Sequence, residues 1–272
     1  MDVTVSLLPP IMDRTASSDG SVSIDGSGSS DGSISSDGSG ADLGSSPDVA
    51  VVIDVLRATS VMATALAAGA AEIITCLEIE QARQWKTRLG GDALLCGERQ
   101  CKRIEGFDLG NSPGEYSAQI VRGRTLVLTT TNGTRAINAA RHAGRVVTAS
   151  FLNLSAVVDS LAGAGTVMLV CAGTDGETTG EDTLLAGAMA EACQQKFAAN
   201  LIGQGSATAL AAWQSFRQSG VSLAKHLRET AGGRNLVRYG FESDLDRCAM
   251  IDSLNEIPTQ VDADPAAFVS RR

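Results

Sequence analysis

Short apolar runs alternate with amphipathic stretches along most of the chain after residue 48. The runs predict buried strands, at residues 49–55, 72–77, 93–96, 125–130, 145–149 and 166–171. The stretches between and after them predict helices, at residues 59–68, 79–89, 114–121, 134–143, 154–162, 181–196, 206–218 and 221–230. Strands that are each followed by a helix are typical of a largely parallel sheet covered on both faces. We therefore expect an α/β core with a helical C-terminal portion.

The two ends of the chain break this alternation. Residues 1–15 begin with a short strand, and residues 16–46 are nearly all Ser, Gly and Asp, with Asp-Gly recurring every six residues. A calcium-binding or β-helical repeat would need an inward aliphatic residue in most turns, and the repeated stretch at 19–38 offers only Val22, Ile24 and Ile34. The composition instead favours a disordered polar insertion. We expect the α/β domain to span residues 47–262, followed by a C-terminal tail at 263–272.

Composition and charge narrow the choice of partners. The 272 residues include 22 Lys and Arg against 31 Asp and Glu, a net charge of −9. Such a chain lacks the basic stripe that a nucleic acid or an anionic membrane requires. No signal peptide or spanning segment is evident, so we expect a cytoplasmic protein without membrane contact. A homodimer is compatible with these features, since many soluble proteins form one.

The first candidate site follows the strand predicted at residues 49–55, because ligands of open α/β sheets bind at the carboxyl ends of strands. Asp54 ends an apolar run, Arg57 follows it, and Thr59 opens the next helix. A helix N-terminus suits a phosphate group. An Asp54–Arg57 ion pair beside a hydroxyl cap would explain the same residues without any ligand.

The second candidate is the polar run TTTNGT between a strand and a helix. Gly133 permits a positive φ, and N–H groups around Asn132 and Thr134 could form an anion-binding nest. A simple capping turn built from Asn-Gly and a Thr cap would look alike.

The third candidate follows the strand predicted at residues 166–171. Glu181 and Asp182 lie at the start of a helix, and carboxylates with Thr hydroxyls and water are typical Mg²⁺ ligands. The alternative is that both acids only complement the helix dipole. Cys171 ends the strand, where it is either a small buried side chain or a catalytic thiol.

The fourth candidate is the loop at residues 97–113. A loop of about 17 residues inside a compact domain is usually functional or disordered. It carries Glu98, Arg103, Asp108 and Asn111, and its basic residues could meet an anionic substrate. A solvated charged loop, held down by its three large apolar residues, is the other interpretation.

The four candidate motifs, taken together, point to a protein family more specifically than any one of them does alone. DVLRAT, GE followed by GFDLGNSPGE, TTTNGTRA, and CAG followed by ED and AG occur in this order, with a looser match at residues 233–236 and 244–249. The chain thereby resembles the 2-phosphosulfolactate phosphatase family of coenzyme M biosynthesis. Cys101 stands where this pattern leads us to expect Gly, and the Ser/Gly/Asp insertion is not part of it.

The resemblance implies a three-layer α/β/α fold and a Mg²⁺-dependent phosphatase. The implied reaction converts (R)-2-phospho-3-sulfolactate to (R)-3-sulfolactate and phosphate. A related enzyme for another small phosphorylated hydroxy acid, or a non-catalytic anion-binding module, stays open. Attack on phosphorus by a Mg²⁺-activated water competes with a covalent aspartyl-phosphate on Asp54.

Each candidate residue receives an expected role under this hypothesis. Mg²⁺ would be held by carboxylates, namely Asp54, Glu181 and Asp182, with Glu98 also possible. The phosphoryl oxygens would meet Arg57, Thr59, Asn132, Gly133 and Thr134. The rest of the substrate would contact Arg103, Asp108, Asn111 and Arg234, of which the two Arg residues would clamp its carboxylate and sulfonate. Glu98 and Cys171 complete the catalytic candidates.

Overall fold

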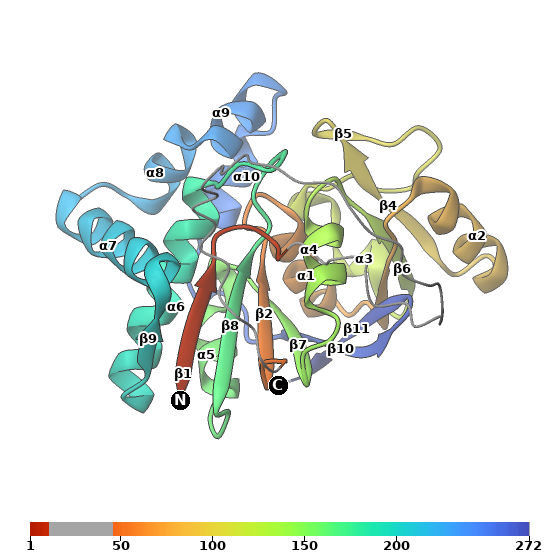
Figure 1. The fold of residues 1–272 in the computed structure, drawn as a ribbon. Helices are drawn as coiled ribbons and strands as arrows, with labels where there is room; N and C mark the ends of the chain where they lie inside the picture. Colours follow the sequence, from red (N-terminus) through yellow and green to blue (C-terminus); the bar gives the residue numbers. More distant parts are fainter. Residues whose placement is uncertain (11–45, 272) are drawn as a thin grey trace, which may run out of the picture.

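The computed structural model describes residues 1–10 and 46–271, and its strands form one mixed sheet (Figure 1). The order across the sheet is β5-β4-β6-β3-β11-β10-β7-β2-β8-β1-β9. The strands are β1 (Asp2–Ser6), β2 (Val49–Ile53), β3 (Glu72–Thr75), β4 (Leu94–Arg99), β5 (Lys102–Arg103), β6 (Thr125–Thr129), β7 (Arg145–Ala149), β8 (Thr166–Cys171), β9 (Asn200–Ile202), β10 (Ile257–Ala263) and β11 (Ala266–Arg271). The predicted insertion at 16–46 lies outside the described residues except for its last position, so its disorder stays a prediction.

Helices fill the connections between the strands. The α-helices are α1 (Ala58–Ala67), α2 (Ile79–Leu89), α3 (Ala118–Val121), α4 (Gly133–Ala140), α5 (Leu154–Ser160), α6 (Gly180–Phe197), α7 (Gly203–Ser219), α8 (Leu223–Glu229), α9 (Ala231–Arg238) and α10 (Glu242–Cys248). Two 3₁₀ turns, η1 (Pro113–Glu115) and η2 (Phe151–Asn153), precede α3 and α5. Most predicted boundaries agree within two residues, because local signals set them. Gly90, for example, ends α2 with a φ of 80°.

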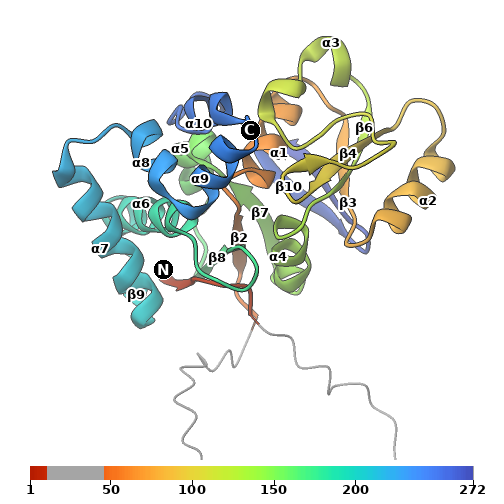
Figure 2. The same cartoon turned by 90° about the horizontal axis from the view of Figure 1, so that it is seen from above.

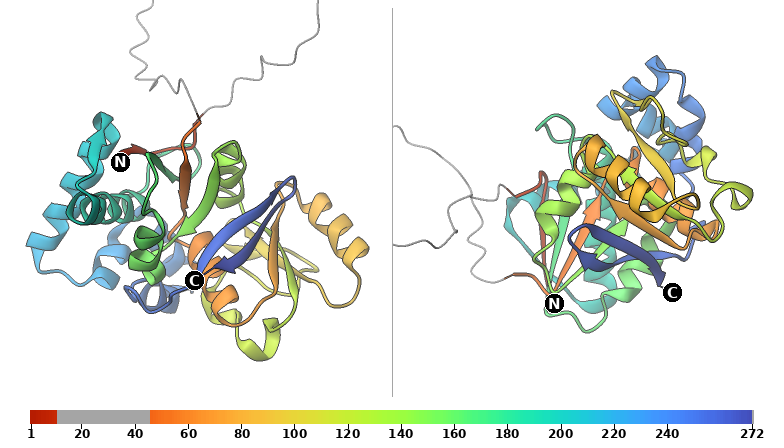
Figure 3. Two further views of the ribbon diagram at one scale, coloured as in Figure 1. Left: turned by 90° about the horizontal axis from the view of Figure 1, so that it is seen from below. Right: turned by 90° about the vertical axis from the view of Figure 1, so that its right-hand side faces the viewer.

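The C-terminal hairpin corrects the sequence prediction. We expected residues 263–272 to be a tail without periodicity, but β11 pairs with β10 along its whole length. This hairpin lies inside the sheet, where β11 pairs antiparallel with β3 and β10 pairs antiparallel with β7 (Figure 3). It joins two parallel blocks, β4-β6-β3 and β7-β2-β8-β1-β9. The sheet is therefore mixed, and the chain end is one of its central elements.

Alternate residues of β2 face opposite helical layers. Val51 and Ile53 belong to the apolar core that contains α5 and α6, whereas Ala50 and Val52 belong to the core that contains α1 and α4. This alternation follows from the two-residue period of a strand. All five residues of the strand are buried, as expected for a strand covered on both faces. The predicted three-layer α/β/α arrangement is confirmed.

The last three helices lie beyond the strand ends. Helices α8, α9 and α10 pack against one another above the end of the sheet at which β2 and β8 stop (Figures 1 and 2). They confirm the predicted helical C-terminal portion, although only α8 was expected as a separate helix. Within the described ranges, no helix combines the length and apolar composition needed to cross a bilayer. The helical portion thus covers the edge at which the polar strand ends gather.

Candidate active site

A cavity of about 630 Å³ opens at this edge of the sheet. Its wall comes from the turn after β2, the β4–β5 turn, the turn after β6, the loop after β8 and helix α9. The first three candidate motifs therefore meet in one place, together with residues from both ends of the fourth candidate, the loop at 97–113. The residues that face the cavity include Asp54, Arg57, Glu98, Asn111 and Asn132 from the sequence prediction.

The turn between β2 and α1 holds Asp54 by hydrogen bonds. Its Oδ1 accepts the backbone N–H of Ala58 at 3.2 Å. Thr59 fixes the main chain of the same residue, since its hydroxyl donates to the Asp54 carbonyl at 2.8 Å and accepts the Asp54 N–H at 3.1 Å. The Thr59 side chain is buried and does not face the cavity. In this structure Thr59 shapes the turn, and its contact with substrate stays a prediction.

Burial and like charges act together on Asp54. The pKa of its carboxyl is raised to about 7, mainly because burial disfavours the charged form and also because the carboxylates of Glu98 and Glu181 lie nearby, while the Ala58 N–H and Arg57 oppose the shift. The site therefore concentrates negative charge at the end of β2. Such a site favours either a proton or a cation near Asp54.

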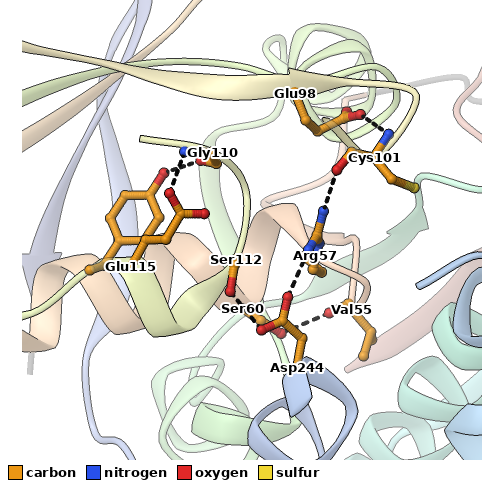
Figure 4. Close-up of polar contacts among 10 residues, drawn as sticks. Val55, Arg57, Ser60, Glu98, Cys101, Gly110, Ser112, Glu115 and Asp244 are labelled. Atoms are coloured by element: carbon orange, nitrogen blue, oxygen red, sulfur yellow. Dashed lines mark hydrogen bonds and ion pairs between the residues drawn. The ribbon is translucent and has the colours of Figure 1, made fainter. Parts of the chain in front are cut away.

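Arg57 does not pair with Asp54, the alternative that the sequence left open. Its Nη1 lies 2.7 Å from Asp244 Oδ2, and its Nη2 donates to the Cys101 carbonyl at 3.2 Å (Figure 4). The guanidinium carbon also lies 4.3 Å from the centre of the Phe241 ring. Arg57 is buried, but it still contributes to the cavity wall. A long-range partner from α10 thus replaces the local ion pair.

The carboxylate of Glu98 joins two turns at the cavity. Its Oε1 accepts the N–H and the hydroxyl of Thr131, and its Oε2 accepts the N–H of Cys101 at 2.9 Å. Cys101 has a φ of 64°, in the left-handed region that favours glycine, which agrees with the Gly expected at this position. Glu98 is therefore an organising residue of the cavity wall, with both oxygens engaged.

The turn after β6 contributes three predicted residues in three different ways. Asn132 faces the cavity. Gly133 lacks the predicted positive φ but is needed for close approach, because a Cβ there would lie 2.5 Å from the Ala58 Cβ and 2.7 Å from Asp54 Oδ2. Thr134 is buried and exchanges hydrogen bonds with Thr130, so it caps the turn instead of meeting substrate.

The first turn of α6 separates the two acids that the sequence grouped as metal ligands. Asp182 is buried and bridges two strand ends, since Oδ1 accepts the Val55 N–H at 2.9 Å and Oδ2 accepts the Gly173 N–H at 3.2 Å. Glu181 is also buried, but its Oε2 has no hydrogen-bond partner among the described residues. A Cβ on Gly232 would lie 2.0 Å from Glu181 Oε1, so α9 packs directly on this carboxylate.

A metal held by protein atoms alone does not fit these residues. Within residues 1–10 and 46–271, no three His, Cys, Asp or Glu side chains gather closely enough to hold an ion. Mg²⁺, however, usually takes one or two carboxylates and completes its shell with water and substrate phosphate. The unpartnered Oε2 of Glu181 and the charge-crowded Asp54 fit that pattern. Asp182 fits it less well, because both of its oxygens already accept backbone N–H groups.

Several predicted residues do not line the cavity. Cys171 is fully buried in the core, where burial raises the pKa of its thiol well above the usual range, so the structure does not support its catalytic role. Arg103 and Asp108 are exposed; the Asp108 carboxylate accepts the Leu95 N–H, and Arg103 donates to the Asp108 carbonyl. Arg234 is exposed on α9 and donates to the Glu229 carbonyl, and its charge opposes the rise that burial causes in the pKa of the nearby Glu181 carboxyl. The contacts of Arg103 and Asp108 fit the alternative of a solvated loop held down by its apolar residues.

Some residues at the site had no role assigned from the sequence. They include Arg99 and Thr131, which belong to the candidate motifs, as well as Asn235 and Asp244. Asn235 directly follows the candidate Arg234, and Asp244 lies in the looser matching segment, so both had a weak signal. Asn111 was predicted, and its buried Oδ1 has no hydrogen-bond partner in the described part of the chain.

The fold and this cavity define an α/β enzyme whose site combines carboxylates, a buried arginine and the side-chain amides of asparagines. Comparison with known sequences makes the assignment specific. The chain belongs to the 2-phosphosulpholactate phosphatase family, a family of phosphoric monoester hydrolases, whose sequence model matches residues 39–263.

Individual relatives agree with this family assignment. A protein of Thermotoga petrophila is 43% identical over 212 residues, which cover 78% of this chain and 88% of the relative. Relatives from Symbiobacterium thermophilum and Microcystis aeruginosa are 42% and 39% identical, each over 88% or more of its own length and 77% or more of this chain. All three are named probable 2-phosphosulfolactate phosphatases. The resemblance inferred from the motifs is confirmed.

Proposed function

We propose that this protein hydrolyses (R)-2-phospho-3-sulfolactate to (R)-3-sulfolactate and phosphate, with Mg²⁺ bound at Asp54 and Glu181. The observation that carries the proposal is the convergence of these two carboxylates beside the Arg57-walled cavity. The names of the relatives give the substrate. This reaction would place the protein in coenzyme M biosynthesis, the pathway implied by the resemblance.

Charge explains why a cation is needed. The substrate carries a phosphate, a carboxylate and a sulfonate, whereas the charged residues of the cavity wall are three acids, Asp54, Glu98 and Asp175, and two arginines, Arg57 and Arg99. Without a further counter-charge, the acids would repel the anionic substrate. Bound Mg²⁺ would offset the carboxylates and polarise the phosphoryl oxygens. Phosphoryl transfer depends mainly on such positioning and charge neutralisation.

The chain's own residues would divide the remaining work. Arg57 would face a phosphoryl oxygen with the donors that Asp244 and Cys101 leave free. Asn111 and Asn132 would orient the rest of the substrate from opposite segments of the wall. Asp54, once ionised, would either take a proton from the attacking water or attack phosphorus itself. Both routes require the Asp54 carboxylate at the end of β2.

The test is phosphate release, measured with Mg²⁺ and with chelator, from 2-phosphosulfolactate and from 2-phospholactate as the matched ester without sulfonate. We expect chelator-sensitive release that is fastest with 2-phosphosulfolactate. D54N should abolish it, and D92N, which changes an exposed acid before β4, should not. Faster release from another ester would overturn the substrate. No release from any ester by folded protein with Mg²⁺ would favour an anion-binding module. The cytoplasmic location and the homodimer stay predictions.

A further inference from the structure

The ion pair between Arg57 and Asp244 connects two parts of the chain that are far apart in sequence. Arg57 lies in the turn after β2, and Asp244 lies on α10. Their side chains are 2% and 1% exposed, and the two charged atoms are 2.7 Å apart. Within the described residues, the other ion pairs are on more exposed side chains. This pair is therefore the buried charged contact between the cavity wall and the C-terminal helices.

Three further contacts fix the direction of the Arg57 guanidinium. Ser112 donates a hydrogen bond of 2.6 Å to Asp244 Oδ1 and so holds the carboxylate that holds Arg57 (Figure 4). Nη2 of Arg57 donates to the Cys101 carbonyl, and the Phe241 ring covers the guanidinium from α10. Residues from the loop before η1, the β4–β5 turn and α10 thus surround one cationic group at the cavity.

Stability alone is a weak reason for such a pair. Removing two charges from water is costly, and a buried ion pair is often no more stabilising than apolar residues of the same volume. Orientation gives a better reason. Arg57 lies near Asp54, whose pKa it lowers. Without Asp244, attraction would draw the guanidinium toward Asp54 and Glu98 instead of toward an incoming anion.

We infer that Asp244 is a positioning residue, which holds the Arg57 guanidinium at the cavity wall in the direction needed to bind the phosphoryl group. Ser112 supports it by fixing the Asp244 carboxylate. The inference rests on the proposed function, because it assumes that a phosphate ester occupies the cavity. It assigns to α10 a part in the reaction, although no residue of α10 faces the cavity.

The test compares D244N with L245A, a matched control on the same helix. Leu245 is buried in the apolar core and does not line the cavity, and the ion pair of Arg57 is with Asp244. We therefore expect L245A to weaken the packing of α10 and to leave the ion pair in place. For each variant we would measure kcat/KM for 2-phosphosulfolactate, the Kd of inorganic phosphate by calorimetry, and Tm. Misplacement of a catalytic group by about 1 Å can cost about 100-fold in rate.

We expect D244N to lower kcat/KM by about 10–100-fold and to weaken phosphate binding about tenfold, on the same argument from misplacement. L245A should lower Tm at least as much as D244N does, but its kcat/KM and its phosphate Kd should stay within about threefold of the wild-type values. For S112A we expect losses in kcat/KM and in phosphate affinity that lie between those of D244N and L245A. Because Asp244 acts through Arg57, D244N should add little to the loss already caused by R57K.

Several outcomes would overturn the inference. One is a loss of activity that follows Tm equally in D244N and L245A; another is a full additional loss when D244N is combined with R57K. If D244N does not fold, the S112A variant tests the inference in its place. A phosphate Kd in S112A equal to that of the wild type then counts against a positioning role of Asp244. If the wild type hydrolyses no phosphate ester, the proposed function fails. The phosphate Kd values then still decide whether Asp244 positions Arg57.

Discussion

Glu98 and Thr131 are joined twice, because Oε1 of Glu98 accepts the Thr131 backbone N–H at 2.8 Å and the Thr131 hydroxyl at 2.9 Å. The other carboxylate oxygen accepts the N–H of Cys101. One buried side chain therefore fixes the turn after β6 and the β4–β5 turn relative to each other. These hydrogen bonds of Glu98 hold two parts of the cavity wall together, even though the two turns are about thirty residues apart in sequence.

Removal of the Glu98 carboxylate should lower the free energy of unfolding more than removal of one of its hydrogen bonds does. Hydrogen bonds to a charged group contribute about 1.5–3 kcal/mol each. We expect E98A to lower the free energy of unfolding by about 3–5 kcal/mol, and T131A, which keeps the backbone bond, by about 1–2 kcal/mol. Urea titrations of both variants would check this. An E98A loss no larger than that of T131A would show that the carboxylate does not hold the two turns.

Backbone strain at Cys101 gives a second prediction. Its φ of 64° is unfavourable for a residue with a Cβ, at a cost of about 1 kcal/mol. C101G relieves this strain, whereas C101A keeps it and removes only the thiol. We expect C101G to be about 1 kcal/mol more stable than C101A, with phosphatase activity retained in both. Denaturant unfolding of the pair measures the difference. Equal stability would show that the turn carries no strain.

Local patterns predicted most of the fold up to α8, since most strands and helices there have their own apolar signal. The short strands β5 and β9 lack such a signal and were not predicted. The C-terminal hairpin was missed because β10 and β11 are both exposed and partly polar toward their C-terminal ends. Their burial comes from strands β3 and β7, more than 100 residues away in sequence. Such a strand is defined by its neighbours and not by its own pattern.

The candidate site, too, was predicted only where local sequence patterns mark it. Asp54, Asn111 and Asn132 were predicted because strand ends and long loops mark cavities in α/β folds. The partner of Arg57 could not be predicted, since no spacing rule connects Arg57 to Asp244 on α10. Glu181 and Asp182 are neighbours in sequence and look equivalent there. Only packing shows that Asp182 is occupied by the N–H groups of Val55 and Gly173.

The raised pKa of Asp54 should make stability depend on pH in chelator. In the folded protein this carboxyl keeps its proton up to about pH 7, while the unfolded chain loses it near 3.8. Between these values the native state binds more protons, so wild-type stability falls as pH rises. D54N lacks this loss, and its advantage over wild type should grow by about 2–3 kcal/mol from pH 5 to pH 7. Urea unfolding at each pH measures it. A constant difference would mean that Asp54 is ionised throughout.

Glu181 and Asp182 should respond differently to Mg²⁺. Binding at ten times Kd contributes about 1.4 kcal/mol, which raises Tm by about 3–6 °C in a protein of this size. E181Q should lose this shift, because it alters the carboxylate whose Oε2 is unpartnered among the described residues. D182A should keep the shift from a lower starting Tm, because it leaves two buried N–H groups without acceptors at about 1–3 kcal/mol each. Thermal melts with Mg²⁺ and with chelator compare the two variants. Loss of the shift in D182A, with its retention in E181Q, would make Asp182 the ligand and reverse this assignment.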